Sequence, residues 1–288
     1  MLAWRLVRSA MWRAAEREVA DHLPLGSDGI IRGAQSIYHG GHPRAALLLH
    51  GMGDTPQSLR TLAKRLADAG WTVSVPLLPG HGRTLAQFSG SGASEWSNAA
   101  GNAYDELARQ HPVVVVCGQS MGALLAIELA ARLPLHSLVL LAPYIAMPRL
   151  ARAVGAGWPL FQAVYPIMKT RDRRSIQDPV AASESLGFGY ATPRLLFELS
   201  QMVRRARRDL RAIQSATLVI YSREDNRVPP QEVVRALARI EHPVKAVHLV
   251  SGCGHVLTAD YCKDHVATLV IEWLERATSP HPVEPAAR

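Results

Sequence analysis

Residues 113–122 read Val-Val-Val-Val-Cys-Gly-Gln-Ser-Met-Gly, and a helix-forming segment over 123–133 follows them directly. The first five residues are apolar and mostly β-branched, which predicts a strand buried on both faces of a parallel sheet. The next five match Gly-x-Ser-x-Gly, a pattern that forms a sharp turn with an exposed serine when it joins a strand to a helix. This context favours Ser120 as a nucleophile, with the elbow glycines Gly118 and Gly122 preventing a clash between strand and helix. The alternative is a serine that only caps the helix.

Segments on both sides of this turn alternate between strand-like and helix-like patterns. Strands are predicted over 45–49, 72–76, 138–142, 217–221 and 244–250, and helices over 55–70, 95–109, 230–240 and 260–276. Such alternation implies a parallel sheet with helices on both faces. The predicted fold class is therefore α/β with a mostly parallel sheet.

The main domain is predicted to span residues 27–277, with a small cap inserted at about 145–212. The insertion separates two sheet strands by many more residues than the dozen or so that a crossover helix requires. It is rich in aromatic and basic side chains, which favours a cap that is apolar inside and basic outside. Residues 278–288 contain three prolines and are predicted to form a disordered tail.

Residues 1–26 are predicted to form an amphipathic helix that precedes this domain. Trp4, Val7, Met11, Ala15 and Val19 recur at helical spacing, with arginines between them. The apolar stripe has two interpretations: it packs on its own domain or on a second subunit, or it lies on an anionic membrane together with the basic cap. The arginines also interrupt the apolar core that a secretory signal peptide would need. The sequence leaves the oligomeric state open.

The composition is that of a folded globular protein. The chain has 288 residues, of which 48% are hydrophobic and 19% charged. No apolar run approaches the roughly 18 residues that a membrane-spanning helix needs. The net charge is +8, and residues 145–212 hold 12 basic and 5 acidic side chains, so the predicted cap carries nearly all the excess. No nucleic-acid-binding module accompanies that charge, so nucleic acid is not an expected partner.

Three cysteines, Cys117, Cys253 and Cys262, cannot all pair with one another and show no Cys-x-x-Cys spacing. Such usage predicts a reducing, cytoplasmic location, with peripheral membrane contact left open. Cys117 and Cys253 are close to the predicted site in sequence, and we interpret both as packing residues.

Two residues after late strands complete a candidate triad with Ser120. A serine hydroxyl becomes a nucleophile when a base takes its proton and a carboxylate orients that base. Asp225 follows the strand predicted over 217–221, and His255 follows the last predicted strand after a Gly-Cys-Gly turn. Because the ends of parallel strands converge at one edge of the sheet, these three residues are expected to meet.

Two other carboxylates compete with Asp225 for the role of the acid. Glu224 lies one residue earlier, and Asp260 lies five residues after His255. We expect Glu224 to point away from the histidine and Asp260 to cap the final helix.

Backbone N–H groups are expected to stabilise the oxyanion of a tetrahedral intermediate. One donor is the N–H of Met121, at the N-terminus of the helix after Ser120, where the helix dipole also favours negative charge. The second is the N–H of Met52, in the loop after His50-Gly51. His50 and His81 are interpreted as residues that hold loops by hydrogen bonding.

Several motifs in order resemble the bacterial carboxylesterase and monoacylglycerol lipase group of the α/β-hydrolase superfamily. They are His50-Gly51-Met52-Gly53-Asp54-Thr55-Pro56, Pro79-Gly80-His81-Gly82, Gly118 to Gly122, the Asp225 segment, and Gly254-His255-Val256-Leu257-Thr258-Ala259-Asp260-Tyr261. The resemblance covers about residues 45–276. It implies an α/β-hydrolase fold with a small cap over an acyl pocket, a serine esterase that uses no cofactor and no metal, Ser120 as nucleophile, Asp225 as acid, His255 as base, and Met52 and Met121 as oxyanion donors.

The expected function is hydrolysis of short- to medium-chain acyl esters, a class of small-molecule substrate, through an acyl-enzyme. Monoacylglycerol lipase is the nearest alternative, although the sequence between Ala142 and Arg171 lacks the acidic cap residue that the resemblance implies for holding glycerol hydroxyls. A thioesterase or an acyltransferase would use the same triad. A serine at the elbow argues against the dehalogenases and epoxide hydrolases that place an aspartate there. A non-catalytic binding protein on this fold is the remaining alternative.

Overall fold

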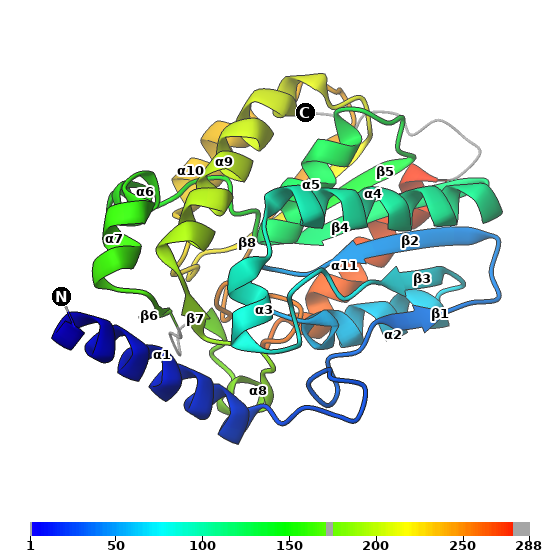
Figure 1. Ribbon diagram of the computed structural model, residues 1–288. Helices are drawn as coiled ribbons and strands as arrows, with labels where there is room; N and C mark the ends of the chain where they lie inside the picture. Colours follow the sequence, from blue (N-terminus) through cyan, green and yellow to red (C-terminus); the bar gives the residue numbers. More distant parts are fainter. Residues whose placement is uncertain (1, 171–174, 279–288) are drawn as a thin grey trace.

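A computed structural model describes residues 2–170 and 175–278 (Figure 1). Most of the predicted tail, residues 279–288, therefore lies outside the described residues. A seven-stranded sheet runs through the centre of the molecule, with helices on both of its faces and a group of short elements at one end. This arrangement confirms the predicted α/β fold class.

The sheet has the strand order β1-β3-β2-β4-β5-β8-β9. Only β1 is antiparallel to its neighbour, so the sheet is mostly parallel as predicted. The strands are β1 (Ile37–His39), β2 (Arg44–Leu49), β3 (Thr72–Val75), β4 (Val113–Gln119), β5 (Ser137–Leu141), β8 (Thr217–Ser222) and β9 (Lys245–Val250). The sequence patterns missed β1, because three residues are too few to show a period.

Alternate residues of the central strands enter two separate apolar cores. On β2, Leu47 and Leu49 face one core while Ala46 and Leu48 face the other. Buried residues on both faces explain why β4 and its neighbours are continuous apolar runs.

Each core is covered by its own set of helices. The first contains buried side chains of α3 (Leu85–Gly90), α4 (Ala93–Gln110), α5 (Met121–Ala130) and α10 (Pro230–Leu237). The second contains those of η1 (Pro56–Leu59), α2 (Arg60–Asp68) and α11 (Lys263–Ala277). Because these helices cover the faces of the sheet, the loops that follow the carboxyl ends of β4, β8 and β9 lie at its edge.

The insertion between β5 and β8 contains mostly short elements. They are α6 (Arg149–Ala156), α7 (Trp158–Val164), β6 (Met168–Lys169), α8 (Pro179–Glu184), β7 (Tyr190–Ala191), α9 (Pro193–Asp209) and η3 (Leu210–Ala212). The long helix α9 buries Leu195, Leu199 and Met202 in the first core. The insertion is therefore anchored to the main domain along its last helix.

Helix α1 (Leu2–His22) packs on the same molecule at its C-terminal half. Ala15, Val19 and Leu23 are buried in the first core. At its other end the indole of Trp4 donates a hydrogen bond to the carbonyl of Ala163 at 2.8 Å, yet the Trp4 side chain stays 42% exposed. The predicted apolar stripe therefore divides into a buried half and an exposed half. None of the helices in residues 2–170 and 175–278 is long and apolar enough to span a bilayer.

A disulfide joins Cys253 to Cys262, with 5.9 Å between their Cα atoms. The interpretation of Cys253 as a packing residue is therefore wrong. A turn between β9 and α11 brings the two residues together, and a separation of nine residues has no signature in the sequence. Cys117 is buried with a free thiol, and burial raises its pKa to about 12. The expected reducing location rested on unpaired cysteines and loses that support.

Candidate active site

The turn between β4 and α5 places Ser120 at the carboxyl end of the central strand. Ser120 has a φ of 56°, a left-handed conformation that L-residues rarely adopt. A Cβ atom on Gly118 would lie 2.2 Å from the carbonyl oxygen of Gly122, and one on Gly122 would lie 2.0 Å from the carbonyl oxygen of Leu49. Only glycine therefore permits this close approach of strand and helix, which holds the serine above the sheet.

His255 links the other two predicted site residues. Its Nε2 atom lies 2.7 Å from Oγ of Ser120, and its Nδ1 atom lies 2.8 Å from Oδ2 of Asp225. The Nδ1–H donates to the carboxylate, so Nε2 is free to accept the serine proton. The side chains of His255 and Asp225 are 7% and 1% exposed. The structure thus brings together three residues that lie far apart in the chain.

The loop after β8 fixes the orientation of the Asp225 carboxylate. Its Oδ1 atom accepts hydrogen bonds from the N–H groups of Arg227 at 2.7 Å and Val228 at 3.0 Å. Burial alone would raise the pKa of Asp225, but the charge and hydrogen bond of His255 and these N–H groups lower it overall. Asp225 is therefore held ionised, with one oxygen facing the imidazole.

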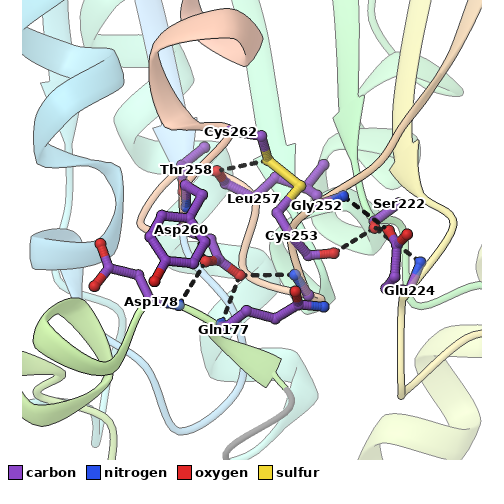
Figure 2. Close-up of a disulfide and its surroundings, with 12 residues drawn as sticks. Gln177, Asp178, Ser222, Glu224, Gly252, Cys253, Leu257, Thr258, Asp260 and Cys262 are labelled. Carbon is purple, nitrogen blue, oxygen red and sulfur yellow. Dashed lines mark hydrogen bonds between the residues drawn. A yellow bond between two sulfur atoms is a disulfide. The ribbon is translucent and has the colours of Figure 1, made fainter.

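Neither rival carboxylate contacts His255 in this way. Glu224 accepts hydrogen bonds from the Ser222 hydroxyl at 3.1 Å and from the Gly252 N–H at 3.2 Å (Figure 2). Asp260 was expected to cap α11, but the N-cap of that helix is Cys262. The Asp260 carboxylate instead binds N–H groups of neighbouring loops, because the turn before α11 points it inward.

His50 and His81 bind backbone groups of the loops around the site. The Nδ1 atom of His50 pairs with the Gly51 carbonyl at 3.0 Å, and its Nε2 atom accepts the Leu78 N–H at 3.1 Å. Complete burial lowers the pKa of His50 to about 4, and burial also lowers the pKa of His81 well below its usual range. Both imidazoles are therefore neutral.

A cavity of about 900 Å³ opens beside Ser120 and His255. Met52 and Met121, the predicted oxyanion donors, also line it. The backbone of Gly51 lies directly against Ser120, since a Cβ atom there would be 3.3 Å from the serine Cβ. Both predicted donors thus belong to segments that adjoin the serine.

Sequence reasoning missed two contributions to this cavity. Helix α1 supplies Glu18 and His22 to its wall, and Leu23 follows directly after the helix, although the sequence suggested a separate extension. The Glu18 carboxylate accepts the Tyr190 hydroxyl at 2.7 Å and pairs with Lys169 of β6. Asp54 also lines the cavity, and burial raises its pKa to about 6. Asp54 lies in the loop motif after β2, and this position could have indicated that it belongs to the cavity. Nothing in the sequence of α1 indicated that this helix lines the cavity.

The arrangement can transfer an acyl group to a serine hydroxyl. A buried carboxylate, a histidine and a serine form one hydrogen-bonded chain at the floor of a cavity, which matches the requirement for an activated nucleophile. Among residues 2–170 and 175–278, no group of three or more His, Cys, Asp or Glu side chains is placed to hold a metal ion.

Several known proteins are similar to this chain. Residues 41–261 match the family described as serine aminopeptidase, S33 (Hydrolase_4). A thermostable monoacylglycerol lipase of Bacillus sp. (strain H-257) is 25% identical over 248 residues, which cover 86% of this chain and 96% of the relative. A carboxylesterase of Bacillus subtilis (strain 168) is 24% identical over 238 residues, which cover 82% and 94%.

Solved structures with the same fold include lipolytic enzymes. One, from a study of the metagenome-derived lipolytic enzymes LipS and LipT, superposes with a TM-score of 0.78 at 25% identity and covers 85% of this chain and 99% of its own. The monoacylglycerol lipase of Paleococcus ferrophilus gives a TM-score of 0.74 at 20% identity, with coverage of 84% and 98%. Residues 1–40, which include α1, lie outside the family match.

Proposed function

This chain belongs to the serine aminopeptidase S33 family of hydrolases, and from that premise we propose that it is a serine carboxylesterase. The observation that carries the proposal is the hydrogen-bonded chain from Ser120 through His255 to Asp225, with distances of 2.7 and 2.8 Å. Similarity to a monoacylglycerol lipase and to a carboxylesterase supports ester hydrolysis.

The proposed reaction begins with attack of Ser120 Oγ on the ester carbonyl. His255 Nε2 takes the serine proton, and Asp225 stabilises the resulting imidazolium. The N–H groups of Met52 and Met121 bind the oxyanion, and the second of these lies at the N-terminus of α5. The C–O bond to the alcohol then breaks, and His255 returns its proton to that oxygen. In the second half of the reaction, His255 takes a proton from water as the water oxygen attacks the acyl carbonyl. The C–O bond to Ser120 then breaks, and His255 returns the proton to the serine oxygen.

We propose that the cavity takes an acyl chain of about four to ten carbons. Its volume of about 900 Å³ lies within the range of small-molecule sites. Apolar side chains of Leu23, Leu196 and Leu199 line it. Each buried methylene contributes about 0.8 kcal/mol to binding, so specificity rises with length until the cavity is filled.

Monoacylglycerol is the second candidate substrate, favoured by the relative at 25% identity. Among residues 2–170 and 175–278, the acidic side chains that line the cavity are Glu18 of α1 and Asp54 of the loop after β2, and we propose that these could contact glycerol hydroxyls. Thioesters and acyl acceptors other than water are compatible with the same triad.

We also propose peripheral contact with anionic lipid through α1 and the neighbouring cap helices. Leu160 and Phe161 of α7 are 78% and 40% exposed, next to the exposed Trp4. The sequence contains arginines or lysine but no acidic residue in residues 1–15 and 142–170. Exposed apolar side chains in segments that carry only basic charges suit an acidic bilayer.

A hydrolysis panel tests the proposed reaction. Nitrophenyl esters of two to sixteen carbons are compared with monoacylglycerols, an acyl thioester and an aminoacyl nitroanilide, the last because the family description names an aminopeptidase. We expect kcat/KM for the esters to exceed that for the nitroanilide by orders of magnitude. Among the esters, kcat/KM should be highest for acyl chains of about four to ten carbons. Preference for the nitroanilide would contradict it.

A further inference from the structure

The loop that carries His255 is closed by a disulfide and by a carboxylate. Cys253 and Cys262 bound it on either side, and Asp260 lies within it, fully buried. Thr258 adds a third attachment, since its hydroxyl donates to the side-chain oxygen of Gln119 at 2.6 Å. The residue before Ser120 therefore also contacts this loop.

Asp260 accepts four backbone hydrogen bonds, which Figure 2 places beside the disulfide. One oxygen binds the N–H of Gly254 at 2.7 Å and that of Gln177 at 2.8 Å. The other binds the N–H of Asp178 at 2.9 Å and that of Tyr261 at 2.8 Å. The carboxylate thus joins the residue directly before His255 to the cap segment that precedes α8.

The cap segment touches the loop on the other side of His255 as well. The N–H of Val256 donates to the Ser175 carbonyl at 2.9 Å. Ser175 and Gln177 in turn line the cavity beside Ser120. Both neighbours of His255 are therefore fixed, directly or through Asp260, to a wall of the substrate cavity.

We propose that Asp260 is a positioning residue for the reaction: it seats the His255 loop on cap residues 175–178 and thereby sets the distance between His255 Nε2 and Ser120 Oγ. The inference rests on the proposed role of His255 as the base.

The four N–H groups that converge on Asp260 suit a carboxylate side chain at this position. Four converging N–H donors need acceptors, and a carboxylate supplies two oxygens with about four lone-pair positions. The NH₂ group of an asparagine would face two of these N–H donors and could not accept their hydrogen bonds. The backbone segments that carry these two donors would then move away from residue 260. A displacement of about 1 Å at a catalytic group can lower the rate about 100-fold.

The test compares Asp260→Asn with Asp264→Asn, a matched control whose carboxylate pairs with Arg65 at the surface. The substrate is nitrophenyl acetate, whose short acyl group keeps the contribution of acyl-chain binding small, and active-site titration counts the reactive serines. We expect kcat of Asp260→Asn to fall by about 10- to 100-fold with KM within twofold of wild type. The control should stay within twofold in both constants.

Fluorophosphonate labelling of Ser120 separates this inference from the proposed function, because the labelling step needs the base but no particular ester. Slow labelling of Asp260→Asn would support the inference even if the wild type proved inactive on every ester tested. A folded Asp260→Asn variant with unchanged kcat and labelling rate, or one in which only KM rises, would overturn it. If Asp260→Asn does not fold, Asp260→Glu is tested in its place, because glutamate keeps both carboxylate oxygens but moves them by one methylene. An unchanged kcat of Asp260→Glu would also overturn the inference.

Discussion

Nδ1 of His255 lies 2.8 Å from Oδ2 of Asp225, although the neighbouring residue Glu224 carries an equivalent carboxylate. The selection is made by the loop after β8. Its N–H groups hold the Asp225 carboxylate toward the histidine, while the Ser222 hydroxyl and the Gly252 N–H bind that of Glu224. Two adjacent carboxylates therefore occupy separate environments.

This difference predicts unequal effects of two isosteric changes. Asp225→Asn should lower kcat by about 10⁴-fold, because an amide no longer holds the His255 tautomer that accepts the serine proton. Glu224→Gln should lower it less than about threefold, since its partners lie outside the triad. Steady-state hydrolysis of a nitrophenyl ester measures both. The reverse order would reassign the acid to Glu224.

The close packing at the turn predicts that Gly122→Ala does not fold. Its Cβ would overlap the Leu49 carbonyl, and the backbone of β2 cannot move without disturbing its ladder with β4. Gly101→Ala is the matched control, because Gly101 lies within α4 with open space around it. That change should raise the free energy of unfolding by about 0.5–1 kcal/mol. Soluble yield and urea unfolding report both outcomes, and a stable Gly122→Ala would contradict the described approach.

Helix α1 is expected to affect acyl-chain preference because His22 lines the cavity. His22→Trp adds bulk to this wall and should shift the optimal ester toward shorter chains, with kcat/KM falling about fourfold for each methylene excluded, the equivalent of about 0.8 kcal/mol. Activity on the acetate should hardly change. Asp21→Trp, at an exposed position one residue earlier, serves as the control. Identical chain-length profiles for the two variants would remove α1 from the substrate site.

Binding to anionic vesicles is expected to depend on the exposed half of α1 and on α7. Trp4→Ser combined with Leu160→Ser should reduce co-sedimentation with phosphatidylglycerol vesicles, and raised salt should weaken binding of the wild type. Tyr38→Ser is the control, because Tyr38 is 61% exposed on β1. Point variants are preferable to removal of α1, whose Val19 lies in the core. If the wild type, the double variant and the Tyr38→Ser control were all recovered equally in the supernatant at every salt concentration, the proposal would be wrong.

The buried imidazole of His50 predicts a loss of stability in acid. Burial lowers its folded-state pKa from 6.5 to about 4, so the unfolded chain binds the proton first. The corresponding stability is complete above pH 6.5 and is lost as the pH falls toward 4, by roughly 3 kcal/mol at about 1.4 kcal/mol per pKa unit. Urea unfolding across this window should show a shallower pH dependence for His50→Gln than for wild type. A parallel pair of curves would mean that burial does not lower the pKa of His50 in the folded protein.

The sequence predicted what depends on short motifs and strand order. The run before Ser120 identified β4, and the rule that parallel strand ends converge placed Asp225 and His255 at one edge. These inferences needed only local patterns and one general property of parallel sheets.

The folding of one turn and the packing of distant segments determined what the sequence could not predict. The pairing of Cys253 with Cys262 depends on how the turn before α11 folds, and the cavity contribution of Glu18 depends on α1 contacting β6 and β7. Asp260 looked like a helix cap because it precedes a helical pattern, but the turn before α11 points it inward, where N–H groups of its own loop and of the cap segment bind it.

The position of His255 also has a consequence for the timing of biosynthesis. Ser120 and His255 are 135 residues apart in the chain. At translation rates of about 5–20 residues per second, the ribosome adds the histidine roughly 7–27 seconds after the serine. During this interval the nascent chain contains Ser120 but not the histidine that we propose as its base. On the proposed mechanism, hydrolytic activity can begin only after the segment that carries His255 has been made and has folded against Ser120.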